Sequence, residues 1–513
     1  MYVRKTLWVL LAVLLAMPVT AYGGYRFTPI AETVDWMGPV PTMGEEMDWA
    51  LNNAGQVVFD GRDEDQMGRV LYRGDGQSLT RIAPSWLYST GDMSGNGHFD
   101  MNDAGTVIFT SGYDGSTMAP DSAYTTQNGV SFQLVLSSDT YLGSPSTWPF
   151  GSWVDGIGPV SINNAGVIAF EAMVTSGDGM EYDRGLYTRQ PGGDIQALFS
   201  VESDAFHRYG PLSINNAGDV TFRGNIDDMG SARLFQSTVP NMFKIIDGKT
   251  HDFWNGGPVP SANDAGMVAF SDTRWDEQTQ TDVSELVLSD GYTRTVVLSM
   301  QTMEGFDDPA VNNEGQVAFE LVYWDEQTQT DVEAIYAGPD LVADKVIARG
   351  DSLFGMGVQS VEFSTRGLND SGQIAFWAEL YNSDLGLYVH GLYLADPVIL
   401  GDFNVDGQTN LLDIEGFTAA ILDGGAGFLA AHPDMTIADI DPSGGANPGD
   451  PVISLLDIPC FVQIVTGGGQ AVAIPEPTSL GLLSLACVCL LRRRGHIPAS
   501  SQPTAQPVQS QSV

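Results

Sequence analysis

Asn52-Asn53-Ala54-Gly55-Gln56-Val57-Val58-Phe59 is the stretch of sequence that decides the fold. Asparagine begins tight turns because its side chain bonds to its own backbone, and glycine supplies the positive φ that such turns require. Val57 and Phe59 stand two residues apart, so they face the same side of a strand. The stretch therefore predicts a tight turn that leads into a strand.

This turn motif occurs seven times. Its further copies begin, 48 to 61 residues apart, at Asn102, Asn163, Asn215, Asn263, Asn312 and Asn369. One longer segment, Trp-Asp-Glu-Gln-Thr-Gln-Thr-Asp-Val, is identical at residues 275–283 and 324–332. Such regular self-similarity indicates a repeat protein made by duplication.

Most repeats carry a second hairpin, seen best at residues 185–198, where Pro191-Gly192-Gly193 separates two strand-like runs. Four strands in each of seven repeats predict an all-β, seven-bladed β-propeller over residues 25–398. We expect residues 25–34 to add a strand that locks the last blade to the first, since ring closure removes sheet edges. Two stacked sandwiches are the alternative architecture.

The repeats, with Val346-Ile-Ala-Arg-Gly-Asp351, resemble those of large exported bacterial proteins of unknown function. That resemblance covers about 370 residues and implies no particular activity.

The two ends of the chain have the composition of targeting segments. Arg4 and Lys5 precede an apolar run and the tripeptide Val19-Thr20-Ala21, which predicts a signal peptide over residues 1–21 with cleavage after Ala21. An uncleaved anchor helix is the alternative interpretation.

Near the other end, Pro475-Glu476-Pro477 precedes an apolar stretch and the cluster Arg492, Arg493 and Arg494. These three parts over residues 475–494 resemble the PEP-CTERM sorting signal of bacterial surface proteins. The resemblance implies a short, transient membrane helix and cleavage by an exosortase near Pro475, Glu476 and Pro477. Residues 478–491 would rise only about 21 Å as a helix, less than a membrane core. The Pro/Gln/Ser-rich residues 495–513 are expected to be a disordered tail.

A small α-helical, EF-hand-like calcium module is predicted over residues 399–467. Oxygen ligands occur at calcium-loop spacing, with Gly407 at the sixth position and Gln408 offering its backbone carbonyl; they are Asp402, Asn404, Asp406, Gln408, Asn410 and Asp413. Leu412, Phe417, Ala420 and Ile421 predict the amphipathic helix that follows the loop.

Asp at the twelfth loop position resembles dockerin type I, which implies a cohesin-like partner. A second, weaker half contains the sequence Leu-Leu-Asp-Ile again, and its expected ligands are Asp439, Asp441, Ser443 and Asp457. Its loop is longer, and Pro459 stands in its helix. A calcium-stiffened spacer is the alternative role for the module.

The charge of the chain excludes several classes of partner. The chain has 64 acidic against 22 basic residues, a net charge of −42, which argues against binding nucleic acid or an anionic lipid surface. The six histidines show no metal-ligand spacing, and no nucleophile or phosphate-loop motif occurs, so no catalytic residue is assigned. Trp275 and Trp324, with the adjacent acids Asp276, Glu277, Asp325 and Glu326, could be sugar platforms or simple strand aromatics.

The sequence therefore predicts an exported protein of the cell surface or extracellular matrix that binds or scaffolds, with calcium as its cofactor and polysaccharide as a possible ligand. A polysaccharide-degrading propeller enzyme is one alternative, and a purely structural matrix component is another.

Overall fold

The computed structural model of the chain describes residues 22–399 with gaps, Phe403, and residues 414–423. The gaps are residues 35–47, 64–65, 85–98, 112–121, 138–139, 144–151, 177–181, 200–207, 226–230, 241, 253–258, 278, 302–304 and 326–329. The predicted signal peptide, the predicted ligands of both calcium loops, the sorting segment and the tail lie outside the described residues.

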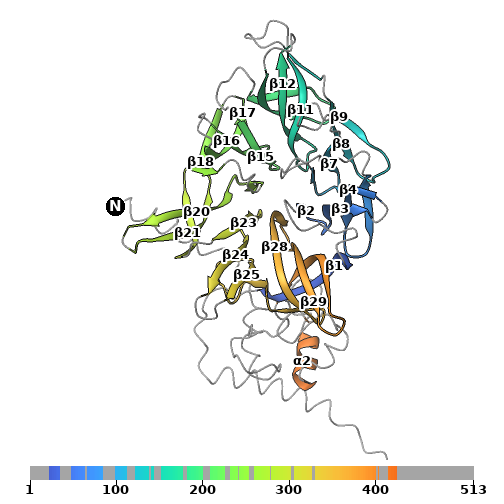
Figure 1. Cartoon of the computed structure of the whole chain (residues 1–513), viewed down its shortest axis with the longest axis vertical. Coiled ribbons are helices and arrows are strands. Elements are labelled where there is room, and N and C mark those ends of the chain that lie inside the picture. The colour runs from blue at the N-terminus through green and yellow to red at the C-terminus, as the bar shows by residue number, and fades with distance from the viewer. Residues whose placement is uncertain are drawn as a thin grey trace, which may run out of the picture.

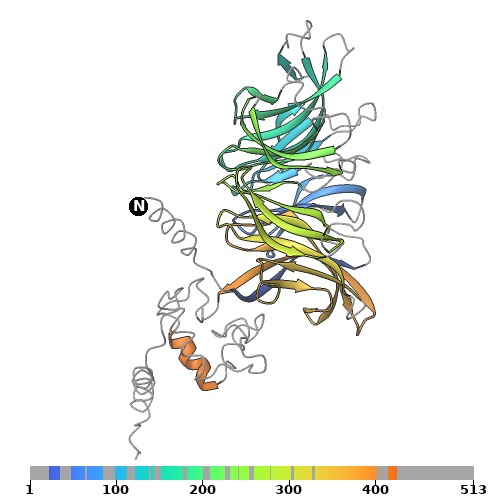
Figure 2. The ribbon, with the colours of Figure 1, turned by 90° about the vertical axis from the view of Figure 1, so that its left-hand side faces the viewer.

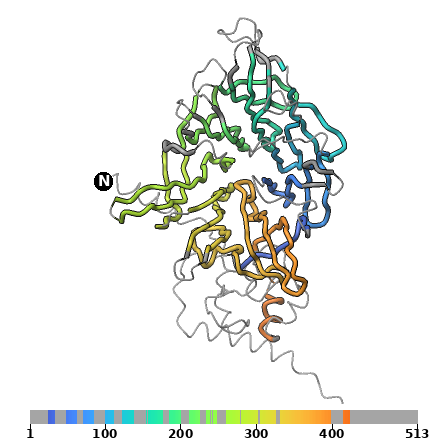
Figure 3. Tube along the Cα trace, in the orientation of Figure 1, coloured from blue at the N-terminus to red at the C-terminus, as the bar shows by residue number. Residues whose placement is uncertain are grey.

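Seven antiparallel sheets surround a central axis in chain order, which makes the molecule a seven-bladed β-propeller (Figures 1 and 3). Turned by 90°, the strands cross the narrow dimension of the molecule (Figure 2). The propeller prediction is therefore confirmed, and the alternative of two sandwiches is wrong.

The first four blades have these strands. Blade 1 has β2 (Trp49–Leu51), β3 (Val57–Asp63), β4 (Gln66–Gly74) and β5 (Leu79–Ala83). Blade 2 has β6 (Phe99–Met101), β7 (Val107–Ser111), β8 (Ser122–Thr126) and β9 (Gln133–Ser137). Blade 3 has β10 (Tyr141–Gly143), β11 (Ser152–Ile162), β12 (Ile168–Ser176), β13 (Tyr182–Arg189) and β14 (Ile195–Phe199). Blade 4 has β15 (Arg208–Ile214), β16 (Val220–Asn225), β17 (Ser231–Val239) and β18 (Met242–Asp252).

The remaining blades complete the circle. Blade 5 has β19 (Ser261–Ala262), β20 (Val268–Asp276), β21 (Thr281–Ser289) and β22 (Arg294–Met300). Blade 6 has β23 (Phe306–Val311), β24 (Val317–Asp325), β25 (Thr330–Tyr336) and β26 (Lys345–Ala348). Blade 7 has β27 (Ser352–Leu353), β28 (Met356–Leu368), β29 (Ile374–Asn382), β30 (Leu387–Ile399) and β1 (Tyr22–Val34).

The circle of blades is closed by contacts near the axis and by strand pairing at the rim. Near the axis, the strand that leads into each asparagine turn contacts its counterparts in both neighbouring blades; these inner strands are β2, β6, β11, β15, β19, β23 and β28. At the rim, β1 pairs antiparallel with β30 from Tyr22↔Ile399 to Val34↔Val389. The predicted closing strand is confirmed: the start of the chain supplies the outer strand of the last blade.

The hydrophobic core lies between the blades. Val57 and Phe59 pack on blade 7, whereas Val58 on the opposite face of the same strand packs on blade 2. In six blades, an aromatic ring follows the inner strand on each of the next two strands, and the two rings lie close together. The ring centroids of Phe59 and Tyr72, for example, are 5.9 Å apart. Apolar residues on both faces of the second strand are therefore buried, one set against each neighbouring blade.

The helix predicted to follow the calcium loop is present as α2 (Ile414–Asp423). It buries Phe417 and Ala420, and the Phe417 ring lies 5.4 Å from that of Phe403. No helix in the described part of the chain is long and apolar enough to span a membrane.

Candidate functional site

The propeller has two different faces. We count the four strands of each blade outward from its inner strand. Because these strands alternate in direction, the turns between strands one and two and between strands three and four lie at one face. We call this the turn face. The hairpins between strands two and three lie at the opposite face, the loop face. The axial channel runs between the two faces and is the first candidate site.

A closed ring of hydrogen bonds joins the seven turns around the axis. The first asparagine of each turn donates its Nδ2 to the main-chain oxygen of the corresponding asparagine in the next blade, at 2.8–3.2 Å. Its Oδ1 accepts a main-chain N–H of its own turn, as Asn52 does from Gln56 at 2.9 Å. These asparagines are buried. Aspartate has no donor for this role, and the position must both donate and accept.

A second ring, closer to solvent, uses the next residue of each turn. Its main-chain N–H donates to the side-chain Oδ1 of the corresponding residue in the next blade, at 2.7–2.9 Å. Around the ring the residues are Asn53, Asp103, Asn164, Asn216, Asp264, Asn313 and Asp370. Each aspartate lies between two asparagines whose amides donate to it. No two carboxylates of this ring are adjacent, which limits repulsion at the mouth of the channel.

Arg366 of β28 lies in the channel beneath these rings. Its guanidinium donates to the Asp48 carboxylate and to the Phe99 main-chain oxygen, and it lies 5.2 Å from the Phe99 ring centroid. Asp100, 3.6 Å from the same guanidinium, accepts from Ser161 Oγ at 2.6 Å. These contacts connect blades 7, 1, 2 and 3. The turn-face depression above them has a volume of about 200 Å³.

Three carboxyl groups lie around the axis in blades 6 and 7. Burial raises the pKa of Asp308 to about 7, and the charges of Asp307, Asp48 and Glu362 act in the same direction. Burial, with the charge of Glu333, likewise raises the pKa of Glu362 to about 7. Protonated carboxyl groups are therefore present near neutral pH.

Glu320 is the most buried of the three. Burial and the charge of Glu362 raise its pKa well above the ordinary value, although its Oε2 accepts the Phe363 main-chain N–H at 3.0 Å. A small cavity of about 110 Å³ lies beside Asp308 and is also lined by Arg223 and Arg233. No cluster of three or more metal-ligating side chains occurs among the described residues.

The duplicated hairpins carry the second candidate site. Trp275 of β20 pairs with Asp282, and Trp324 of β24 pairs with Asp331, at the same position of adjacent blades. The two tryptophans are 58% and 51% exposed. Tyr381 holds the same position in blade 7, and its ring lies 5.1 Å from that of Tyr388.

All three aromatic side chains stand at the loop-face end of the second strand. Asp276 and Glu277 follow Trp275 into its turn, whereas the side chains of Asp325 and Glu326 lie outside the described residues. Blades 5, 6 and 7 thus each carry an aromatic residue at the same position of the loop face.

The remaining predicted site residues are not tested by this geometry. The calcium ligands, the sorting motif and Ala21 lie outside the described residues. Among the histidines, His390 is buried, stacks on Trp377 and lies 3.5 Å from Glu379, and burial lowers its pKa. It is a core residue and takes no part in a metal cluster of the described chain.

No motif of the sequence predicted the charged side chains near the axis. Glu320 directly follows Phe319, and Arg223 directly follows Phe222, in otherwise apolar runs. A charged residue directly after the repeated phenylalanine was the sequence signal that could have identified these side chains. Arg366 and Asp308 belong to inner strands whose register the sequence alone does not fix.

The fold and the two hydrogen-bonded rings of the asparagine turns define a repeat protein, a seven-bladed β-propeller. The chain belongs to a family of unknown function, DUF7453, whose model matches residues 30–398. No curated protein matches the chain.

Solved structures of similar fold include a prolyl endopeptidase, at 8% identity and TM-score 0.39, with 75% of this chain and 52% of that chain covered. Prolyl oligopeptidase B from Galerina marginata matches at 10% identity and TM-score 0.39, with 72% and 49% covered. PorZ, a bacterial surface component of the type-IX secretion system of Porphyromonas gingivalis, matches at 10% identity and TM-score 0.35, with 70% and 48% covered. The chain spans about half the length of these proteins.

Proposed function

We propose that this protein is an exported, surface-held binding protein whose loop face binds polysaccharide through Trp275 and Trp324. The observation that carries the proposal is the exposure of both tryptophans on identical hairpins of adjacent blades. Tryptophan is largely buried in most folded proteins, because exposing its large ring to water is unfavourable. Two copies held in the open at one repeated position are typical of a contact surface.

The chemistry of the hairpins fits a sugar ligand. An indole face stacks on the apolar face of a pyranose ring, and neighbouring carboxylates such as Asp282 and Asp331 can accept hydrogen bonds from sugar hydroxyls. Adjacent blades would contact successive units of one chain, so weak single contacts would add up.

The ends of the chain complete the proposal. The signal peptide would export the protein, and the sorting segment would place it at the cell surface through an exosortase-type enzyme. The module at residues 399–467 would bind calcium through Asp402 and its partners and present a dockerin-like surface to a cohesin-like protein. The observed α2, with Phe417 packed on Phe403, supports a folded unit after the first loop. Calcium should raise the melting temperature of the protein, and Asp402→Ala should abolish the rise at the first site.

The test uses insoluble polysaccharides and the purified protein. Wild-type protein should be retained on at least one polysaccharide without release of soluble sugar, and the double variant Trp275→Ala/Trp324→Ala should lose that retention. Tyr292→Ala is the matched control, because Tyr292 is 88% exposed on a turn of the opposite face. Equal retention of the double variant and the wild type would refute the role of the tryptophans.

The raised pKa values of Asp308 and Glu362 favour one second candidate, a polysaccharide-degrading enzyme with these groups as proton donors. Under that hypothesis wild-type protein releases reducing sugar, and Glu362→Gln abolishes the release while Glu314→Gln, on an exposed turn, does not. Retention without product would reject the enzyme.

A further inference from the structure

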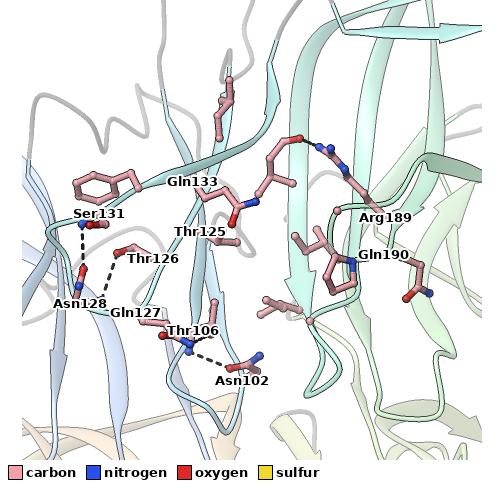
Figure 4. Close-up of a pocket in the computed structure, with 18 residues that line it drawn as sticks. Asn102, Thr106, Thr125, Thr126, Gln127, Asn128, Ser131, Gln133, Arg189 and Gln190 are labelled. Atoms are coloured by element: carbon pink, nitrogen blue, oxygen red, sulfur yellow. Dashed lines mark hydrogen bonds between the residues drawn. The ribbon is translucent and has the colours of Figure 1, made fainter.

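A groove of about 490 Å³ lies between blades 2 and 3 at the turn face (Figure 4). Side chains from both blades enter it: Thr106, Thr125, Gln127 and Gln133 from blade 2, and Arg189 and Gln190 from blade 3. The volume is that of an ordinary small-molecule site. The groove lies at the opposite face to the tryptophan hairpins and is independent of them.

The lining of this groove contrasts with the rest of the protein. Acidic residues outnumber basic ones by 64 to 22 in the chain, yet none of the described residues that line the groove is acidic. Hydroxyl and carboxamide groups supply its polarity, and Arg189 is the one charged side chain among the described lining residues. Hydroxyl and carboxamide groups both donate and accept hydrogen bonds. They therefore match a ligand that does the same and carries no charge.

A bridge that joins blades 1 and 2 is missing at this groove. In blade 1, Arg73 pairs with Val58 and crosses to the next blade, where its Nη1 donates to the main-chain oxygen of Gly105 at 2.7 Å. In blade 2 the register places Thr125 opposite Ile108, at the same position. Threonine is too short to reach Gly166, the counterpart of Gly105. The space that Arg73 fills between blades 1 and 2 therefore stays open between blades 2 and 3.

Arg189 crosses the outer part of the groove. Its Nε donates to the Gly193 main-chain oxygen at 3.1 Å, and its Nη1 donates across the gap to the main-chain oxygen of Val135. Val135 belongs to β9, the outer edge strand of blade 2. This hydrogen bond connects the two blades across the groove. It also occupies a backbone acceptor that an added peptide strand would need.

On the inner side, the polar groups are already oriented. Gln127 Nε2 donates to Thr106 Oγ1 at 3.0 Å, which leaves the Gln127 carbonyl and the Thr106 hydroxyl hydrogen for other partners. Gln133 and Gln190 are exposed on either side of the opening. Phe132 packs on the opposite face of blade 2, in the core shared with blade 1, where its ring lies 6.1 Å from that of Phe109.

From this geometry we propose that the groove between blades 2 and 3 binds an uncharged oligosaccharide, whose hydroxyl groups bond to Thr125, Gln127, Gln133 and Gln190. Sugar hydroxyls donate and accept hydrogen bonds as these side chains do. A peptide is the less favoured ligand because Arg189 already occupies the edge of β9.

The decisive variant is Thr125→Arg, which restores in blade 2 the bridging arginine of blade 1. It should fill the groove by donating to the Gly166 main-chain oxygen, without creating a cavity or removing a core contact. Calorimetric titration of the full protein with cellohexaose, maltohexaose and xylohexaose provides the readout. We expect at least one of these probes to bind the wild type, and Thr125→Arg to weaken that binding at least tenfold with an unchanged melting temperature.

Two further variants locate the binding. The double variant Gln133→Ala/Gln190→Ala changes only exposed side chains and should also weaken binding at least tenfold, so it decides the matter if Thr125→Arg fails to fold. The variant Trp275→Ala/Trp324→Ala should bind the three probes as the wild type does. Loss of binding in the tryptophan variant alone would overturn the groove site and assign the probes to the loop face.

Two other results would overturn the proposal. One is the absence of binding by all three neutral probes. The other is binding confined to a uronic acid oligomer or to an unstructured peptide, tested in parallel, because either would mean that the groove recognises a different class of ligand.

Discussion

Asn369 of the last repeat donates its side-chain amide to the main-chain oxygen of Asn52 in the first repeat at 3.0 Å, across 317 residues of sequence. The six other first asparagines make the same bond to the next blade. The repeated motif therefore does two things at once: it forms a local turn, and it connects each blade to its neighbour near the axis.

Replacing Asn369 by alanine should lower the free energy of unfolding by about 1–3 kcal/mol, because the buried Asn52 oxygen loses a donor and the turn loses its acceptor. Chemical denaturation measures the change. Asn128→Ala is the matched control, since Asn128 accepts two N–H groups of its own turn and makes no hydrogen bond to another blade among the described residues. Equal losses in the two variants would show that the ring bond adds nothing.

Two motif glycines separate backbone strain from crowding. Gly218 has φ +89° with nothing within 4 Å of an added Cβ, whereas at Gly105, with φ +71°, an added Cβ would meet Arg73 Nη1 at 2.9 Å. Gly218→Ala should cost about 1–2 kcal/mol for the left-handed backbone alone. Gly105→Ala should cost more, since Arg73 must also move. The same loss in both would contradict the blade 1 to blade 2 bridge.

The sequence predicted the blades well and the axial channel poorly, for a physical reason. Turn chemistry and strand periodicity are local, so Asn52 and Phe59 reveal their roles without knowledge of the rest of the chain. Arg366 contacts Asp48 and Phe99 only after the seven blades have closed into a ring. Which residues meet at the axis depends on the register of the inner strands, whose lengths range from β19 (Ser261–Ala262) to β28 (Met356–Leu368). The groove at Thr125 likewise depends on comparing strand registers between blades.

The axial carboxyl groups should make the propeller less stable as the pH rises. The pKa of Glu362 is raised from 4.5 to about 7 in the folded protein, so its proton stabilises the fold fully below pH 4.5, and this contribution is lost as the pH rises through 7. Between pH 5 and 8 the melting temperature should fall, and Glu362→Gln should reduce that fall by the equivalent of about 1–3 kcal/mol. An unchanged slope in this variant, compared with Glu314→Gln, would contradict the buried position of Glu362.

Blade 5 should show the opposite pH dependence. Burial alone would raise the pKa of Glu285, but hydrogen bonds from Arg294 and Arg274 lower it below 4.5. The stabilising effect of that charge is therefore present above pH 4.5 and is lost as the pH falls through the lowered pKa.

Arg294→Met should thus destabilise the protein by about 1–3 kcal/mol at pH 7 and by less at pH 3, because it leaves Glu285 and Asp272 without their shared partner. Lys345→Met is the control: its ion pair with Asp351 is well exposed and should be worth about 0.5 kcal/mol or less. A loss for Arg294→Met no larger than for Lys345→Met would refute the assignment.

The pairing of Tyr22 with Ile399 has a consequence for how the chain could be delivered. The two ends of the propeller lie side by side, so the proposed signal peptide and the proposed calcium module would connect to it at one point of the rim. A chain held at a membrane by the proposed signal peptide and the proposed sorting segment would form a loop whose two ends meet, and the seven blades could assemble without either end crossing the finished disc. Because β1 pairs with β30, the proposed export would have to deliver the chain as far as residue 399 before the ring could close.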